Sequence, residues 1–295
     1  METFKKIQKI QQKVIPMVSR NKYAYKLARF IGNEIYNLYY LIIFPKHFII
    51  KDFNKDFKLI NLKKTGEKFL VRKKNLRNDI STIYEIFVIE AYKTDFLDYI
   101  DKIRGEIVID IGAYIGDTSV FFGKKDAVIY AYEPSKELYE IAKKNIELNN
   151  IDNIKIFNVG IGDVNKNLKM ALNKKNQSDA GNFIIFDEFR SLNMTKKDRF
   201  LFTEEVKIIS LNEVLNKFES VYLLKMDCEG CEFPAIISVK NENLQKIKYI
   251  IMEIHFLQLF DLNVIFEKLK NNNFEVFIKK IELGNYGMLY GRSLS

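Results

Sequence analysis

The chain has 295 residues, 47% of them hydrophobic, which is enough to bury one large core, alone or with a smaller appended module. Its formal net charge of +9 comes from lysines scattered along the chain, which favours an acidic partner but gives no sign of an arginine-rich nucleic-acid arm. Two cysteines, Cys228 and Cys231, are too few for the disulfide framework of a small secreted protein.

The N-terminal 44 residues are predicted to be helical, because apolar residues recur at spacings of three and four, and Pro45 is expected to end this segment. The longest apolar stretch, 35–50, is interrupted by polar residues and falls short of the roughly 20 apolar residues that span a bilayer. We therefore expect a cytoplasmic protein with a helical extension over residues 1–50. This extension either packs on the main domain or makes peripheral membrane contact through residues 24–50.

Residues 51–104 are predicted to form a module that precedes the core. Alternating segments at 57–62 and 68–72 indicate a hairpin that turns at Thr65 and Gly66. A helix is expected from Asp79 to Tyr92 with Ser81 as its N-cap, followed by a second short helix over 96–103.

From residue 105 to residue 295, β-branched runs alternate with amphipathic segments. This alternation predicts an α/β domain whose parallel sheet has helices on both faces. The expected strands are 107–111, 128–132, 154–159, 221–226 and 248–254, with a closing antiparallel-capable pair at 274–279 and 287–291. The polar segment 164–206 interrupts the pattern and is expected to be an insertion, either a substrate lid or a solvated surface loop.

The first strand leads into a glycine turn at Gly112 and Gly116 and then into a helix, an arrangement that binds nucleotide-like ligands at the carboxyl edge of a sheet. The spacing is not the G-x-G-x-x-G of dinucleotide sites, and the Asp110 carboxylate would repel a pyrophosphate. Glu133 ends the second strand, where a carboxylate can accept two hydrogen bonds from a ribose diol. The turn at Gly160 after the third strand is expected to lie beside an adenine edge.

A second polar cluster, 225–232, follows the fourth strand. Asp227 and Glu229 alternate along a segment expected to be extended, so one could act as general base or orient an acceptor while the other pairs with Lys225. Capping of the next helix is the alternative interpretation, especially for Glu232. His255 ends the fifth strand and could take a proton near neutral pH, or could be a packing residue.

The cysteines form one C-x-x-C pair, whereas a zinc site needs four ligands. Even with His255 as a third ligand the set is incomplete, and no thioredoxin-like pattern surrounds it. We expect neither a metal site nor a redox pair.

Six segments in order carry a family resemblance: Val-Ile-Asp-Ile-Gly-Ala-Tyr-Ile-Gly-Asp-Thr-Ser (108–119), Tyr-Ala-Tyr-Glu-Pro-Ser (130–135), Lys-Lys-Asn-Ile-Glu-Leu-Asn (143–149), Val-Gly-Ile-Gly-Asp (159–163), Ser-Leu-Asn-Glu-Val-Leu (210–215) and Leu-Lys-Met-Asp-Cys-Glu-Gly-Cys-Glu (224–232). Together they resemble the FkbM family of S-adenosylmethionine-dependent methyltransferases. The resemblance departs from the family at Tyr114, which replaces the usual asparagine of the turn, and at the two cysteines, which replace small apolar residues.

The resemblance implies a class I methyltransferase fold, a Rossmann-like seven-stranded sheet with an antiparallel last pair. It implies S-adenosylmethionine as the cofactor, with the ribose on Glu133 and the adenine near 159–161. The expected cofactor-binding residues are Asp110, Gly112, Ala113, Tyr114, Gly116, Asp117, Thr118, Glu133, Pro134, Val159, Gly160 and Ile161.

The expected activity is O-methylation of a hydroxyl on a sugar, a glycolipid or another small molecule, without a metal. The expected catalytic residues are Asp227, Glu229, His255 and Lys225. One alternative is methylation of RNA or another nucleic acid, which the positive charge would assist. Another is a non-catalytic module that binds S-adenosylmethionine.

Overall fold

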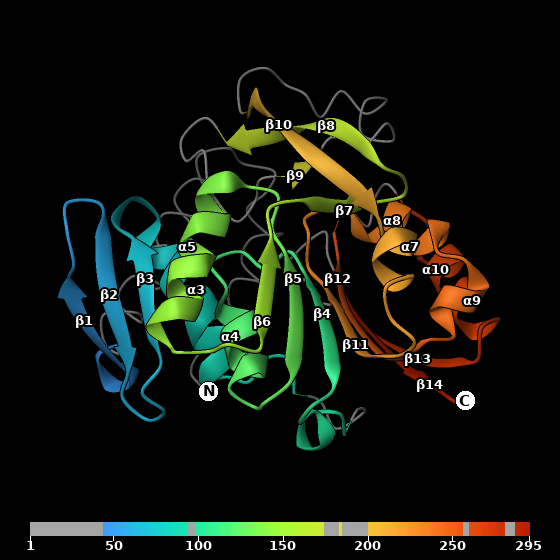
Figure 1. Cartoon of the computed structure of the whole chain (residues 1–295), viewed down its shortest axis with the longest axis horizontal. Helices are drawn as coiled ribbons and strands as arrows, with labels where there is room; N and C mark the ends of the chain where they lie inside the picture. Colours follow the sequence, from blue (N-terminus) through green and yellow to red (C-terminus); the bar gives the residue numbers. More distant parts are fainter. Residues whose placement is uncertain (1–43, 94–97, 174–182, 185–199, 256–259, 281–286) are drawn as a thin grey trace, which may run out of the picture.

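A seven-stranded sheet forms the frame of the structure, a computed structural model that describes residues 44–93, 98–173, 183–184, 200–255, 260–280 and 287–295 (Figure 1). In spatial order its strands are β13 (Phe274–Lys280), β14 (Gly287–Ser293), β12 (Ile247–Ile254), β11 (Val221–Met226), β4 (Ile107–Ile111), β5 (Val128–Tyr132) and β6 (Ile154–Phe157). Strand β14 is antiparallel to both neighbours, and every other pair is parallel. The expected seven-stranded sheet with an antiparallel last pair is confirmed.

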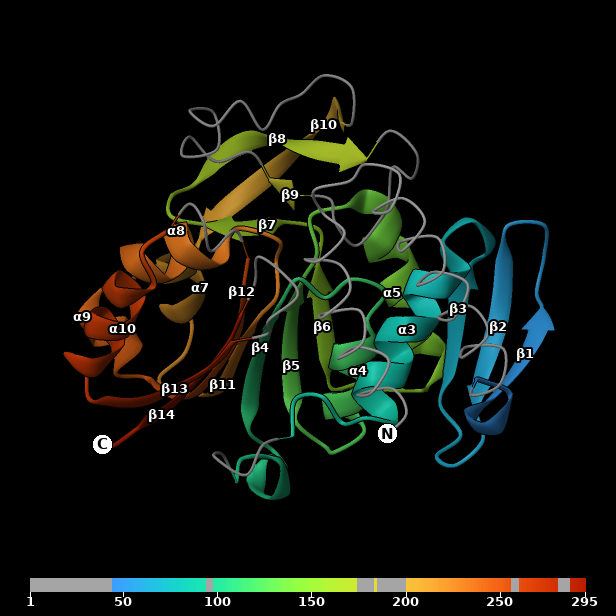
Figure 2. The same ribbon diagram turned by 180° about the vertical axis from the view of Figure 1, so that it is seen from behind.

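Both faces of this sheet are buried. Successive residues of its inner strands point to opposite sides, and those on each side pack in a hydrophobic cluster. On β4, Val108 packs in a cluster with Phe122, whereas Ile109 packs in a second cluster with Ala235 and Ile265. The helices that follow the strands are α4 (Asp117–Gly123), α5 (Lys136–Leu148), α7 (Leu211–Leu215), α8 (Glu232–Ser238), α9 (Asn241–Leu244) and α10 (Leu262–Lys270). Figure 2 shows α4 and α5 at one end of the sheet and α7 to α10 at the other.

The module before the core is an antiparallel sheet of three strands, β1 (Phe48–Asp52), β2 (Phe57–Leu62) and β3 (Lys68–Arg72). The predicted hairpin is confirmed, but β1 is an additional strand that begins within the stretch expected to be a helical extension, 1–50. The edge of β3 is docked on α5 by asparagine amides: Leu70 N donates to Asn145 Oδ1 at 2.7 Å, and Asn149 Nδ2 donates to Lys68 O at 2.7 Å. These side chains take the place of a neighbouring strand.

The helix of this module, α3 (Leu76–Phe87), begins and ends earlier than predicted. Ser81 lies inside the helix rather than at its N-cap, and Asp79 is buried within the first turn, where it has a partner that sequence spacing does not reveal. Two short 3₁₀ turns, η1 (Lys73–Asn75) and η2 (Ile100–Lys102), flank it, and η2 is the described part of the expected second helix. Residues 44–47 are helical, so Pro45 lies within a helical turn and does not end it.

The segment 164–206 was expected to be an insertion, either a substrate lid or a solvated surface loop, and its described part is not a plain loop. It contributes β8 (Lys166–Asn173), β9 (Phe183–Ile184) and most of β10 (Phe200–Ser210), which join β7 (Gly160–Gly162) in a sheet of order β7-β10-β8-β9. Leu168 and Met170 alternate with polar residues and are buried, the pattern of a strand with one apolar face. This small sheet lies over the carboxyl edge of the large one (Figure 1).

Much of the N-terminal extension lies outside the described residues, so its predicted helix and its membrane contact stay predictions. Within the described ranges, no helix has the length and apolar character needed to cross a membrane.

Candidate active site

A pocket opens at the carboxyl ends of β4, β5 and β11, below the small sheet. Together with the open solvent at its mouth, the pocket encloses about 560 Å³ of empty space. It is lined by Ile111, Gly112, Tyr114, Tyr132, Glu133, Pro134, Ser135, Leu138, Gly160, Ile161, Met170, Asp227, Cys228 and Glu229. The sequence-predicted residues Asp110, Ala113, Gly116, Asp117, Thr118, Val159, Lys225 and His255 are not part of this lining.

The floor of the pocket is the turn after β4, and it has no room for a side chain at Gly112. This residue has φ +80°, and a Cβ placed there would lie 1.8 Å from the carbonyl oxygen of Asp227. Asp227 N in turn donates to Ile111 O at 3.0 Å, so the loops after β4 and β11 touch backbone to backbone. The glycine of the motif is required by this close approach.

Asp110 lies behind the turn and pairs with Lys225, which corrects the expected pairing of Lys225 with Asp227 or Glu229. The two residues are register partners on β4 and β11, with Lys225 Nζ 3.0 Å from Asp110 Oδ1 and both side chains almost fully buried. Lys225 Nζ also donates to Gly112 O at 3.0 Å, and Ser119 Oγ donates to Asp110 Oδ2 at 2.6 Å. Asp110 and Lys225 therefore support the turn from beneath and do not face the pocket.

Glu133 lines the pocket at the end of β5, held by two backbone donors. Its Oε1 accepts from Ser135 N and its Oε2 from Tyr114 N, each at 2.9 Å. Burial raises its pKa to about 7, against the opposing effect of these two N–H groups and of the Lys225 charge. Each carboxylate oxygen keeps a second lone pair, so the side chain can still accept from a ligand diol.

The rest of the pocket wall suits a flat apolar group beside that carboxylate. Ile161 and Met170 are buried apolar residues on the small sheet, and Tyr132 and Leu138 belong to β5 and the first turn of α5. The Glu133 carboxylate suits a ribose diol, the apolar wall suits an adenine base, and the further carboxylates suit a cationic sulfonium. These are the main parts of S-adenosylmethionine.

A second group of charged side chains surrounds His255, beyond Asp227 and Glu229. His255 Nε2 lies 4.0 Å from Asp227 Oδ1, 3.6 Å from Glu229 Oε2 and 3.7 Å from Glu253 Oε1. Its Nδ1 lies 3.0 Å from Glu232 Oε1. Four carboxyl groups therefore face one imidazole at the edge of the pocket.

This arrangement changes the expected role of His255. Burial alone would lower its pKa, but Glu232, followed by Glu229 and Asp227, outweighs burial and raises the pKa to about 11. The imidazole is thus an imidazolium at neutral pH and cannot take a further proton. Burial, and then Asp227, raise the pKa of Glu253 to about 8, so this carboxyl is mostly protonated at pH 7.

The segment after β11 is a tight loop and not the extended run expected. Glu229 has φ 55° and Gly230 φ 114°, and Glu232 closes the loop by accepting from Cys228 N at 2.9 Å and from Gly230 N at 2.8 Å. Cys228 and Cys231 form a disulfide with Cα atoms 5.5 Å apart, although the sequence predicted no redox pair. Asp227 and Glu229 still converge on His255, but through this loop.

The residues that could hold a metal ion are Asp227, Glu253 and His255, whose ligand atoms lie within 4.8 Å of one another. The cysteines are engaged with each other, so they offer no thiolate. These two carboxyl groups and the imidazolium can equally accept and donate hydrogen bonds to a polar acceptor.

Sequence reasoning missed three kinds of residue at this site. Tyr132 and Leu138 look like ordinary core positions, and Met170 belongs to a segment interpreted as a polar loop. Glu253 lies two residues before His255 on an apolar strand, a signal that was present in the sequence but not used.

Comparison with known proteins gives consistent results. A family model described as the methyltransferase FkbM domain matches residues 110–276, more than half of the chain. Methyltransferase 1 of Beauveria bassiana is 25% identical over 185 residues, covering 58% of this chain and 71% of the relative. Methyltransferase sdnD of Sordaria araneosa is 25% identical over 204 residues, covering 59% and 79%.

One further relative and one solved structure are also similar, the relative over a shorter stretch. An uncharacterized RNA methyltransferase of Caldanaerobacter subterraneus subsp. tengcongensis is 35% identical over 98 residues, which cover 32% of this chain and only 21% of the relative. Among solved structures, magnesium protoporphyrin IX methyltransferase from Synechocystis PCC 6803, with bound S-adenosylhomocysteine, aligns with TM-score 0.40 at 11% identity, covering 75% of this chain and 85% of that one.

Proposed function

The chain belongs to the FkbM family and is an S-adenosylmethionine-dependent methyltransferase, and from this premise we propose that it methylates a hydroxyl oxygen of a sugar, glycolipid or similar small molecule. The observation that carries the proposal is the ring of carboxyl groups at the mouth of the cofactor pocket. Asp227 and Glu229 belong both to the pocket lining and to the group around His255.

The pocket residues supply the cofactor site in this proposal. Glu133 would accept from the ribose hydroxyls, and Ile161, Leu138 and Met170 would enclose the adenine. When bound, S-adenosylmethionine supplies a methyl group made electrophilic by the positive sulfonium. Asp227 and Glu229 give this part of the pocket a negative potential that favours a cation.

The acceptor hydroxyl is expected to donate its hydrogen bond to Asp227. Asp227 would accept the proton of that hydroxyl, and the bound cofactor would supply the electrophilic methyl group. Tyr92 supports this orientation, because its hydroxyl lies 3.4 Å from Asp227 Oδ2. The His255 imidazolium partly neutralises the charge of the surrounding carboxylates. Holding cofactor and acceptor next to each other in one pocket would supply much of the rate acceleration.

The charge of the mouth bears on the choice of acceptor. Sugar hydroxyls donate to carboxylates, whereas the phosphates of an RNA backbone would be repelled by Asp227, Glu229 and Glu232. Two observations favour RNA as a second candidate: the net charge of +9 and the similarity to an RNA methyltransferase. The lysines that produce this charge are scattered along the chain, so RNA would need a route that keeps its phosphates off the carboxylates.

The test is transfer of a labelled methyl group from S-adenosylmethionine to a panel of glycosides, glycolipids, amines and RNA. We expect label in hydroxyl-bearing small molecules or glycans. Label in RNA alone would replace the proposal with the second candidate, and label on amines alone would show that oxygen is not the acceptor.

A matched pair of variants locates the chemistry. Asp227→Asn keeps the size of the side chain but cannot take a proton, and should slow transfer by about 10²- to 10⁴-fold. Asp152→Asn makes the same change at an exposed position before β6 and should leave the rate unchanged. Equal rates for both variants would remove Asp227 from the mechanism.

A further inference from the structure

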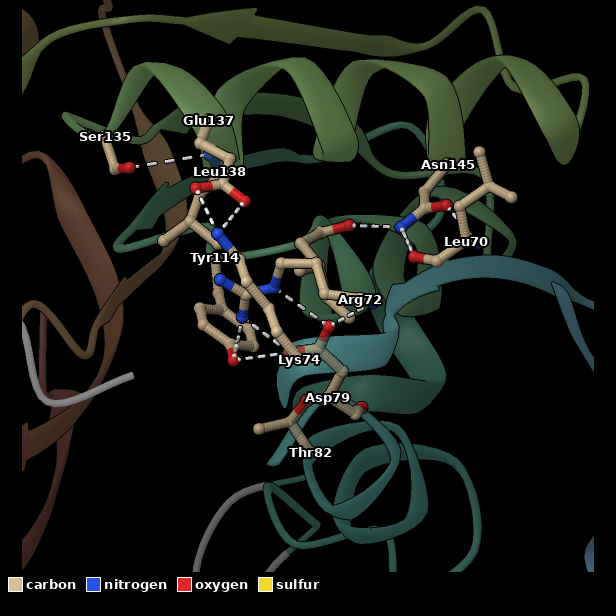
Figure 3. A network of polar contacts seen from close by, with 11 residues as sticks. Leu70, Arg72, Lys74, Asp79, Thr82, Tyr114, Ser135, Glu137, Leu138 and Asn145 are labelled. Atoms are coloured by element: carbon tan, nitrogen blue, oxygen red, sulfur yellow. Dashed lines mark hydrogen bonds and ion pairs between the residues drawn. The ribbon is translucent and has the colours of Figure 1, made fainter. Parts of the chain in front are cut away.

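Tyr114 belongs to the turn after β4, and its side chain is held by residues from outside that turn (Figure 3). The hydroxyl donates to Asp79 Oδ1 at 2.7 Å and accepts from Arg72 Nη2 at 2.6 Å. The Arg72 guanidinium carbon also lies 5.3 Å from the centre of the ring. Tyr114 is thus a lining residue of the pocket whose hydroxyl contacts Arg72 and Asp79.

Arg72 and Asp79 form a buried ion pair whose side chains are 1% and 0% exposed. Asp79 Oδ2 accepts from the Arg72 backbone N at 2.8 Å and from its Nε at 3.1 Å. A pair buried to this degree is a weak source of net stability, because desolvation offsets the attraction between the charges. Both residues belong to the module before the core, outside the 110–276 family match.

Other contacts besides those of Tyr114 attach that module to the core. The Asn145 side chain accepts from Leu70 N at 2.7 Å, and its Nδ2 donates to Ile115 O at 2.8 Å, which ties β3, α5 and the turn together (Figure 3). The contacts of Arg72 and Asp79 with the Tyr114 hydroxyl are additional to this docking.

The backbone of Tyr114 faces the cofactor side. Its φ of 52° is in the left-handed region, which is strained for a residue with a side chain and persists only where the surroundings hold it. In this conformation Tyr114 N donates to Glu133 Oε2 at 2.9 Å. One residue thus connects the buried ion pair to the carboxylate of the cofactor pocket.

We propose that Arg72 and Asp79 are positioning residues for the cofactor: they anchor the Tyr114 side chain, and the anchored Tyr114 orients Glu133 for the ribose. The inference rests on the proposed cofactor site and extends it by a supporting layer contributed by the preceding module. Losing the anchor frees the strained turn to relax, which weakens the hydrogen bond that Glu133 receives.

The test compares Tyr114→Phe with Tyr249→Phe by calorimetric titration with S-adenosylmethionine across pH 6–8.5. Both changes remove one tyrosine–aspartate hydrogen bond, since Tyr249 Oη donates to Asp98 Oδ1 at 3.0 Å. Tyr249 lies in the amino-terminal half of β12, whereas the pocket opens at the carboxyl edge of the sheet. We expect Tyr114→Phe to weaken binding on the order of tenfold, the size of one hydrogen bond to a charged group. Tyr249→Phe should bind as the unaltered protein does.

The pH profile separates positioning from a general loss of stability. The Tyr114 N–H lowers the pKa of Glu133, so its displacement should move the pH midpoint of binding upward in Tyr114→Phe and leave it unmoved in Tyr249→Phe. Asp79→Asn should show the same shift, and combining it with Tyr114→Phe should add little, because both act on one contact. If Asp79→Asn melts below the assay temperature, Tyr114→Phe, which leaves the ion pair intact, decides the question.

The outcomes distinguish this inference from the proposed function. Failure of the unaltered protein to bind S-adenosylmethionine would overturn the cofactor site itself. If the unaltered protein binds, and Glu133→Gln weakens binding while Tyr114→Phe matches the unaltered protein in affinity and pH midpoint, the positioning role alone is overturned.

Discussion

The pH dependence of cofactor affinity should report on Glu133, and the variant Glu133→Gln isolates it. In the free protein, burial raises the pKa of this carboxyl from 4.5 to about 7. A ribose diol donates to the ionised form, so binding favours loss of the proton. The affinity should therefore fall as the pH decreases through 7 and level off above about pH 8.

The size of the effect follows from the ionised fraction. With a pKa of about 7, roughly one tenth of Glu133 is ionised at pH 6 and roughly nine tenths at pH 8, so the dissociation constant should change about tenfold between them. Glutamine cannot ionise and offers one acceptor oxygen to two backbone donors. Glu133→Gln should bind more weakly and lose this part of the pH dependence.

Calorimetric titration with S-adenosylmethionine at pH 6, 7 and 8 measures both effects, with thermal melts of each protein to confirm folding. Other groups that titrate in this range contribute equally to both proteins, so the difference between the two slopes belongs to Glu133. Parallel slopes for Glu133→Gln and the unaltered protein would refute the reasoning.

Three further predictions concern groups around the pocket. Lys225→Met leaves the Asp110 carboxylate buried without its ion pair and should destabilise the fold by about 3–5 kcal/mol in urea unfolding, with partial recovery when Asp110→Asn is added; an unchanged midpoint would contradict the buried pair. The His255 ring should remain protonated at pH 8 by nuclear magnetic resonance, because its carboxylate neighbours raise its pKa to about 11; a titration near 6.5 would contradict the cluster. Replacing Cys228 and Cys231 by serine should lower the free energy of unfolding by about 2 kcal/mol and raise the KM for the acceptor more than the Kd for the cofactor. An unchanged KM for the acceptor would show that the loop does not contribute to acceptor binding.

The large sheet could be predicted from the sequence because its strands are short, mostly apolar runs ended by glycine or acidic residues. The runs at 107–111, 128–132 and 221–226 coincide with β4, β5 and β11. The small sheet was missed because its strands carry many charged residues, and the alternation of Leu168 and Met170 is short. The insertion's predicted role as a lid over the pocket stays a prediction.

The sequence predicts which strand ends form the site, but it predicts the contacts between the side chains there less well. Glu133 and Asp227 lie in the pocket because a strand end fixes the place of the residues that follow it. The pairing of Lys225 with Asp110 depends on the register between β4 and β11, which one strand's sequence does not contain. The contact of Tyr114 with Asp79 joins residues 35 positions apart and depends on tertiary packing.

A crystal structure of the protein with S-adenosylhomocysteine tests the central claim most directly. The account predicts both ribose hydroxyls within hydrogen-bonding distance of the Glu133 carboxylate, and the adenine against Ile161 and Leu138. A ligand bound elsewhere, or bound in this pocket with its ribose away from Glu133, would contradict the account.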